Sequence, residues 1–218
     1  MTSPNYGWSM EQLVHGIVGS SLILGILVTL IVQIQNFIAK RNSAEAIILG
    51  GEINMEIILQ EIDRALDAGL YYIAIAMALT VPDICAALES SNGETSGPKY
   101  KAWYNANLAN KYPNITDADC WSLRCGVLHQ GRCGHPNMQY GRILFTLPNR
   151  QNNVFHNNII NDALNLDAML FCHDVVACAR LWFNGKRNDP VVQSNLPNLV
   201  QLRPQGLAPY MVGMPLIA

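Results

Sequence analysis

The sequence predicts a mainly α-helical protein: a helical bundle with a small β-hairpin insertion, preceded by one transmembrane helix. Half of the 218 residues are hydrophobic and only 14% are charged, which excludes a disordered chain and allows a sizeable core. Apolar residues recur at helical spacing in successive stretches that end near glycine or proline. We therefore divide the chain into an N-terminal leader over 1–51, the bundle over 52–185, and an irregular Pro-rich segment over 186–218 that packs on the bundle.

The leader contains a hydrophobic stretch over residues 13–32. These 20 residues include no Asp, Glu, Lys or Arg, and a helix of that length spans a hydrocarbon core of roughly 30 Å. Lys40 and Arg41 follow the stretch, and the positive-inside tendency places that side in the cytoplasm. We expect a cytoplasmic domain anchored to the inner membrane, and the alternative is a buried or interfacial helix.

A second hypothesis concerns the start of the chain. Gly50, Gly51 and Glu52 lie just before Met55, and Gly-Gly-Glu can be encoded by a purine-rich run that resembles a bacterial ribosome-binding site. Residues 1–54 would then be an incorrectly assigned extension, and a chain that starts at Met55 would be cytoplasmic. Unrelated codons at these three positions would remove the motive for this hypothesis.

The first two helices of the bundle are expected over residues 52–68 and 70–88. The first has apolar residues at helical spacing with acids on the other face, and Gly69 follows it as a stop. The second stretch is apolar and alanine-rich, and it predicts one buried helix or two because Pro82 breaks or kinks a helix. Asp83 argues against a second membrane span there.

The next two helices are expected over residues 99–111 and 116–130. Thr116 can cap the second of these, and the acids at Asp117 and Asp119 lie near the positive end of its dipole. A glycine at position 131 ends it.

Strands and a last helix complete the predicted bundle. Residues 140–147 have the composition of a strand, and residues 154–160 are expected to pair with it as a hairpin. Asn161 or Asp162 then caps a long helix that runs to Phe183.

The clearest chemical signal is the pair Arg124 and His129 near the end of an apolar helix. Residues five apart are about 140° apart around a helix axis, but arginine is long enough to reach an imidazole at the helix end. An imidazole can move protons near neutral pH, and a guanidinium can stabilise charge on phosphoryl oxygens. This pair suits the cleavage of a phosphodiester.

The Arg-x4-His pattern formed by Arg124 and His129, on a late helix of a small bundle, resembles the motif of HEPN-domain proteins. The resemblance covers roughly residues 55–183 at the level of the fold. That family comprises metal-independent ribonucleases and inactive relatives, which often act in toxin–antitoxin, abortive-infection and other defence systems. The resemblance implies RNA as substrate, no cofactor, an antitoxin or defence partner, and a homodimer that brings two Arg/His pairs into one cleft.

Local charge supports an RNA substrate although the net charge of −2 provides no global basic field. Residues 120–161 contain no Asp or Glu but contain four arginines and three histidines. Within this window Arg132, His135 and Arg142 are our candidates for binding the RNA backbone. The alternative is an ordinary solvated polar loop.

Three other interpretations of the motif stay open. The first is a structural role, in which a backbone carbonyl satisfies the histidine at the helix end and the arginine pairs with a surface acid. A metal could be held by the cluster of Cys and His residues over 120–135, but no usual zinc-ligand spacing occurs there, so we expect no metal site. The alternative function is a catalytically inactive, HEPN-like dimeric scaffold or partner-binding module. It is favoured by Cys125, which follows the arginine where many active members carry a polar residue, and by the acidic net charge.

Overall fold

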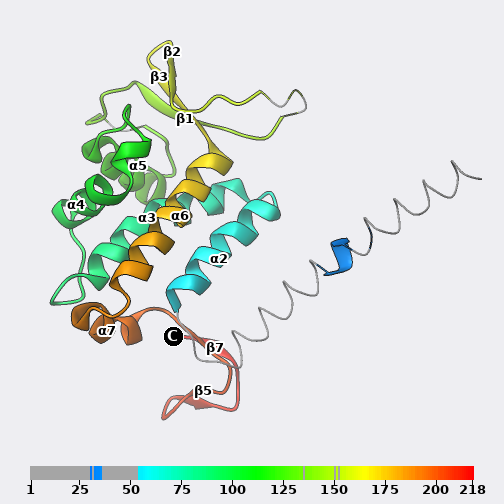
Figure 1. Cartoon of the computed structure of the whole chain (residues 1–218), viewed down its shortest axis with the longest axis vertical. Coiled ribbons are helices and arrows are strands. Elements are labelled where there is room, and N and C mark those ends of the chain that lie inside the picture. Colours follow the sequence, from blue (N-terminus) through cyan, green and yellow to red (C-terminus); the bar gives the residue numbers. More distant parts are fainter. Residues whose placement is uncertain (1–29, 31, 36–53, 135, 150, 152) are drawn as a thin grey trace, which may run out of the picture. The chain divides into compact units, whose positions relative to one another are not determined.

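The computed structural model describes residues 30, 32–35, 54–134, 136–149, 151 and 153–218. The predicted membrane helix over 13–32 lies outside these residues, apart from Leu30 and Val32. The chain divides into two compact units, Met1–Glu52 and Ile53–Ala218. The second unit is mainly helical with a small sheet, which confirms the predicted fold class at that level (Figure 1).

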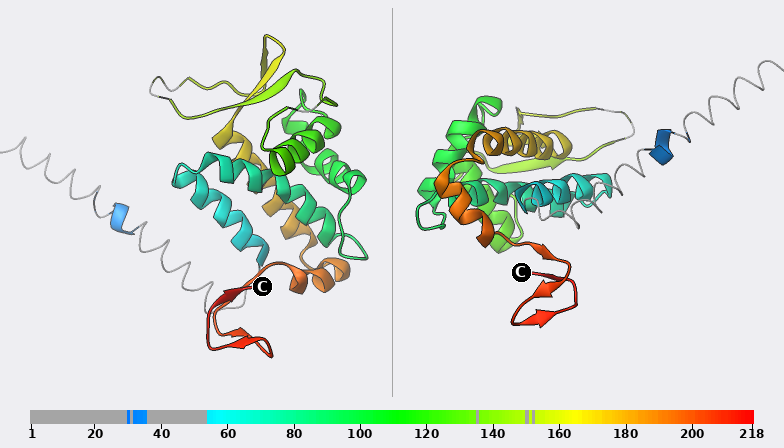
Figure 2. Two further views of the ribbon diagram at one scale, coloured as in Figure 1. Left: turned by 180° about the vertical axis from the view of Figure 1, so that it is seen from behind. Right: turned by 60° about the horizontal axis from the view of Figure 1, so that its bottom comes forward.

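Five longer helices build the bundle: α2 (Asn54–Asp67), α3 (Tyr71–Leu88), α4 (Gly97–Asn107), α5 (Asp117–Gln130) and α6 (Ala168–Lys186). Helix α3 packs against the other four, so it forms the centre of the unit (Figure 2). A 3₁₀ turn, η1 (Ala109–Lys111), follows α4. Helix α3 is continuous through Pro82, so of the two predicted alternatives the single buried helix is confirmed.

Helix α3 is, among the described residues, the one helix long and apolar enough to cross a membrane. However, 56% of it is buried inside the unit, as is usual for the core helix of a globular domain. Ala74, Ala78, Leu79, Val81 and Cys85 are almost completely buried on it. The core also contains three tyrosines whose side chains are fully buried, at positions 100, 104 and 112.

An ion-pair cluster fastens α2 to α6. The Arg180 guanidinium donates to both carboxylate oxygens of Glu56 at 2.8–3.2 Å and to Asp63 Oδ2 at 3.0 Å. These three side chains are partly exposed, so the cluster sets the register of the two helices more than it adds to stability.

The sheet contains β1 (Arg142–Thr146), β2 (Asn158–Ile160) and β3 (Ala163–Asp167) in the order β1-β3-β2. Strand β1 is parallel to β3, and β2 is antiparallel to β3. The predicted pairing of residues 140–147 with 154–160 is therefore wrong, since β3 lies between them.

The error arises because we expected Asn161 or Asp162 to cap the following helix. Both adopt positive φ angles, 49° and 60°, and form the two-residue turn of the β2–β3 hairpin. Helix α6 starts later, at Ala168, where the Asp167 side chain accepts a hydrogen bond from Leu170 N at 2.9 Å.

The C-terminal segment has more regular structure than predicted. It contains α7 (Pro190–Asn195), the 3₁₀ turn η2 (Leu196–Asn198), and two small antiparallel ladders. The ladders join β4 (Leu202–Arg203) to β7 (Leu216–Ile217) and β5 (Gly206–Leu207) to β6 (Met211–Val212). The Asn195 amide donates to the backbone carbonyls of Leu88 and Ser90 at 3.0 and 2.8 Å, which fastens α7 to the end of α3.

We predict that a chain beginning at Met55 folds independently. The described core is formed by residues of the second unit, and the Met55 side chain itself is fully buried in that core. The shortened chain should be soluble without detergent and unfold in one cooperative transition when heated. Aggregation of the shortened chain, while the full chain in detergent is folded, would show that the leader forms part of the core.

Candidate functional site

Helix α5 carries the predicted motif, and both of its ends are as the sequence indicated. Thr116 Oγ1 accepts from Asp119 N at 3.1 Å, and the Asp119 carboxylate accepts from Thr116 N at 3.1 Å, which completes a capping box. Gly131 ends the helix at φ 64°, and its N–H donates to the Val127 carbonyl at 3.2 Å. This helix end fixes where the histidine of the motif lies.

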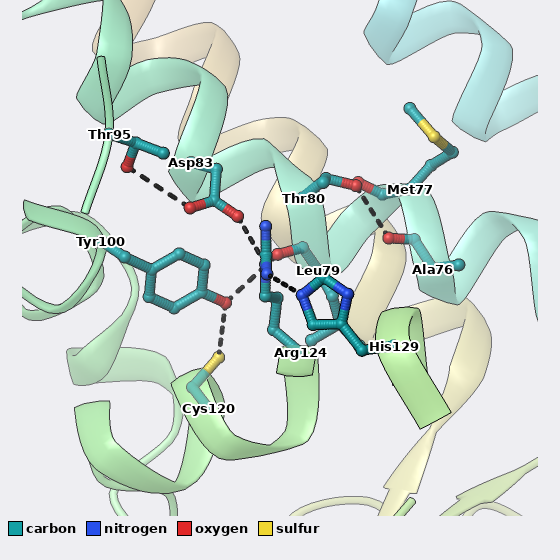
Figure 3. A network of polar contacts seen from close by, with 10 residues as sticks. All are labelled: Ala76, Met77, Leu79, Thr80, Asp83, Thr95, Tyr100, Cys120, Arg124 and His129. Atoms are coloured by element: carbon teal, nitrogen blue, oxygen red, sulfur yellow. Dashed lines mark hydrogen bonds and ion pairs between the residues drawn. The ribbon is translucent and has the colours of Figure 1, made fainter. Parts of the chain in front are cut away.

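Arg124 and His129 are in direct contact. Arg124 Nη1 lies 3.0 Å from His129 Nε2, while Arg124 Nε donates to Asp83 Oδ2 of α3 at 2.7 Å (Figure 3). The guanidinium carbon also lies 5.1 Å from the centre of the Trp121 ring, a cation–π distance. One arginine therefore joins a carboxylate, an imidazole and an indole.

A hydrogen bond between Arg124 and His129 can have only one direction. Every polar hydrogen of a guanidinium is a donor and the group has no acceptor, so His129 Nε2 must contribute its lone pair. An Nε2 lone pair at an exposed helix end is able to accept a proton from a ligand.

Asp83 is the residue of this site that sequence reasoning missed. Its side chain is only 7% exposed, and burial raises the pKa of the carboxyl above its ordinary value, while the neighbouring Arg124 opposes that rise. Thr95 Oγ1 donates to its second oxygen at 3.3 Å. The sequence did contain a signal that could have identified it. Asp83 is the one acid in the apolar run 70–88, and a buried carboxylate requires a partner of opposite charge or a hydrogen-bond donor.

Tyr100 of α4 contacts the Trp121 ring, which in turn packs against the arginine. The hydroxyl of Tyr100 lies 3.2 Å from the Leu79 carbonyl and 3.3 Å from Cys120 Sγ, as Figure 3 shows. Its ring meets the Trp121 ring edge to face at 5.1 Å. Burial raises the pKa of the Cys120 thiol to about 12, so this cysteine is a packing group and not a nucleophile.

Gly126, inside the motif, allows the following loop to fold back onto α5. Arg132 N donates to the Gly126 carbonyl at 3.1 Å. A Cβ at position 126 would lie 2.7 Å from the Arg132 carbonyl oxygen, closer than real Cβ atoms come. Only glycine fits at position 126, and the position of Arg132 in the following loop depends on this glycine.

Two of the three candidate RNA-binding residues lie together. Arg132 and Arg142 line the same open hollow of 270 Å³, and Arg132 also lines a neighbouring hollow of 570 Å³ with Gln139 and Tyr140. Arg132 Nε donates to Gln130 Oε1 at 2.7 Å. His135 lies outside the described residues. Neither Arg124 nor His129 lines either hollow.

The described part of the chain contains no group of three or more His, Cys, Asp or Glu side chains placed to hold a metal ion. Of the cysteines considered as metal ligands, Cys120 is buried and hydrogen-bonded to the Tyr100 hydroxyl, Cys125 is partly buried, and Cys133 is exposed.

No family model, curated protein or solved structure matches this chain, so the site is interpreted from its own geometry.

Gly126→Ala should destabilise the protein. The added methyl group meets the Arg132 backbone, and overpacking of this kind lowers the free energy of unfolding by about 1–3 kcal/mol. The matched control is Gly185→Ala in α6, where nothing lies within 4 Å of the added carbon and stability should rise slightly. Urea denaturation of both variants tests this, and equal effects at the two positions would contradict the proposed backbone contact.

Asp83→Asn should change how stability depends on pH. Because the pKa of Asp83 is raised in the folded state, the folded protein keeps this proton at pH values where the unfolded chain has lost it. The stability that Asp83 contributes is therefore greatest below its ordinary pKa of 3.8 and falls as pH rises through the raised value. Asparagine does not titrate, so the free energy of unfolding of the parent minus that of the variant should fall over this window. Urea titrations at several pH values measure it, and a difference that is flat or grows with pH would contradict the shift.

Proposed function

We propose that this protein is a metal-independent endoribonuclease of the HEPN type, acting as a toxin or antiphage effector. The observation that carries the proposal is the contact between Arg124 Nη1 and His129 Nε2 at 3.0 Å. It brings a proton acceptor and a fixed guanidinium together at an exposed helix end. The sequence window 120–161 contains no acid and three further arginines, of which Arg132 and Arg142 line one hollow.

The proposed reaction uses the 2′-hydroxyl of the RNA as nucleophile. When a phosphate enters, Arg124 Nη1 turns from His129 to a phosphoryl oxygen, because the charged oxygen is the stronger acceptor. His129 Nε2 then takes the 2′-hydroxyl proton, O2′ attacks phosphorus, and the bond from phosphorus to the 5′-oxygen breaks. The products are a 2′,3′-cyclic phosphate and a 5′-hydroxyl that takes up a proton. Asp83 holds the guanidinium in place through Nε throughout.

A homodimer would supply the second proton-transfer group. The motif of one protomer contains one histidine, and proton removal and proton delivery are best shared by two groups. Exposed apolar side chains lie close to the motif in sequence or space: Leu128 on α5, and Leu70, Tyr72 and Ile73 at the start of α3. The Tyr72 hydroxyl lies near Gly131, two residues after the histidine. We propose this surface as the two-fold interface.

The proposal includes the cellular setting. The domain would lie in the cytoplasm, attached to the inner membrane through residues 13–32, or free in the cytoplasm if the chain starts at Met55. A toxin or defence effector of this kind would be restrained by an antitoxin or another defence partner.

A second candidate is an inactive, dimeric HEPN-like scaffold. It is favoured by the ion pair with Asp83, which compensates the charge of Arg124 inside the protein and leaves that side chain only 16% exposed. An arginine fixed in this way is also what a purely structural role would produce.

Replacement of the motif separates the two candidates. His129→Ala should reduce cleavage of single-stranded RNA about a hundred- to thousandfold, since one group essential in the transition state is lost. Arg124→Lys should not restore activity, because lysine lacks the planar fork that binds two phosphate oxygens. The matched control is His173→Ala, an exposed histidine on α6, which should retain full activity.

The same samples provide the deciding measurements. Cleavage should persist in EDTA and fail on RNA with a 2′-deoxy sugar at the scissile position. Sedimentation should show a dimer, and an active monomer would refute the shared cleft. Unchanged cleavage by well-folded His129→Ala protein, or no cleavage by the parent dimer, would leave the scaffold as the function.

A further inference from the structure

A cavity of 440 Å³ lies between the end of α3, the length of α4 and the end of α6, separate from the residues of the motif. Its walls combine three alanines, at positions 86, 102 and 106, with the indoles of Trp103 and Trp182. A volume in this range and a mainly apolar, aromatic wall are typical of small-molecule sites.

Lys99 of α4 lines this cavity with an ammonium group that uncharged oxygens hold in place. Its Nζ donates to Ser90 Oγ at 2.5 Å, to the Glu94 carbonyl at 2.9 Å and to Asn92 Oδ1 at 3.3 Å. These contacts immobilise the cation without neutralising it. A second cation on the lining, Lys186, is paired with Glu89 at 3.1 Å. The three contacts use all three N–H groups of the ammonium, so an anion that enters the cavity would replace one of these neutral acceptors, because a charged oxygen is the stronger acceptor.

The two tryptophans provide an independent observation. Both are buried, at 3% and 7% exposure, and within the described part of the chain neither indole N–H has a hydrogen-bond partner. Buried donors are normally satisfied, and an unpaired one costs about 1–3 kcal/mol. Both tryptophans line the cavity, but their Nε1 atoms are buried, so a ligand in the cavity would supply the missing acceptors only after the rings shift.

We propose that this cavity binds a small planar organic anion of about nucleotide size. Lys99 holds the anionic group, the alanine and indole walls pack against the flat body, and the ring or sugar oxygens and nitrogens accept from the indole N–H groups. Nucleoside 5′-monophosphates combine these features and are the probes of choice. The binding does not depend on the proposed ribonuclease activity, since none of its residues belongs to the motif.

Calorimetric titration of the full chain in detergent tests the proposal. The probes are the four nucleoside 5′-monophosphates, with the matching nucleosides and inorganic phosphate as partial ligands. At least one monophosphate should bind in the micromolar range, and both partial ligands should bind at least tenfold more weakly. Tryptophan fluorescence should change with the same dissociation constant, because two indoles line the cavity.

Two variants decide where the probe binds. Lys99→Gln should weaken binding about tenfold or more through loss of one charged hydrogen bond, whereas Lys101→Gln on the same helix, outside the cavity lining, should change it less than about twofold. Trp182→Phe should weaken binding, and the melting temperature of the free variant measures separately the packing that the smaller ring loses in the core. Failure of every monophosphate to bind at millimolar concentration, or equal affinities for the two lysine variants, would overturn the proposal.

Discussion

Asp83 and Arg124 place a compensated pair of charges in the interior of a helical bundle, and the arrangement around the motif follows from this constraint. A carboxylate on an apolar core helix cannot remain unpaired, because the cost of desolvating it is several kcal/mol. The 2.7 Å contact between Arg124 Nε and Asp83 Oδ2 therefore fixes both the position of α5 along α3 and the rotation of α5 about its own axis. With Nε of Arg124 committed to Asp83, Nη1 is left in position to meet the imidazole at the end of α5.

The segment between α3 and α4 connects this pair to the opposite end of the bundle. Thr95 of this segment donates to Asp83, and the preceding residue, Glu94, accepts from Lys99 through its carbonyl. The Asn195 amide of α7 donates to the carbonyls of Leu88 and Ser90, where α3 ends and the segment begins. A short stretch of chain thus takes part in the motif, in the wall of the α3–α4–α6 cavity and in the attachment of the C-terminal segment.

The sequence predicted those features that depend on local chemistry. The capping box at Thr116 and the glycine at 131 are short-range signals, and the ends of α5 agree with them. The sheet could not be predicted in the same way, because the parallel pairing of β1 with β3 joins residues 142–146 to 163–167 across a long connection. Asn161 and Asp162 are equally suitable as helix caps and as turn residues, and the β2–β3 pairing decided between these roles. The Arg124–His129 contact followed from spacing, whereas Asp83 required knowledge of which helices lie side by side.

The position of Asp83 also has a consequence for biosynthesis. While the chain is being made, α3 emerges before α5, as 18 residues apolar enough to be tested by the machinery that inserts helices into membranes. A carboxylate near the middle of such a segment opposes insertion by about 2.5–3.5 kcal/mol. Asp83 is the thirteenth of the 18 residues, so the aspartate that holds the arginine of the motif also makes membrane insertion of its helix less favourable, by less than this cost at the helix centre.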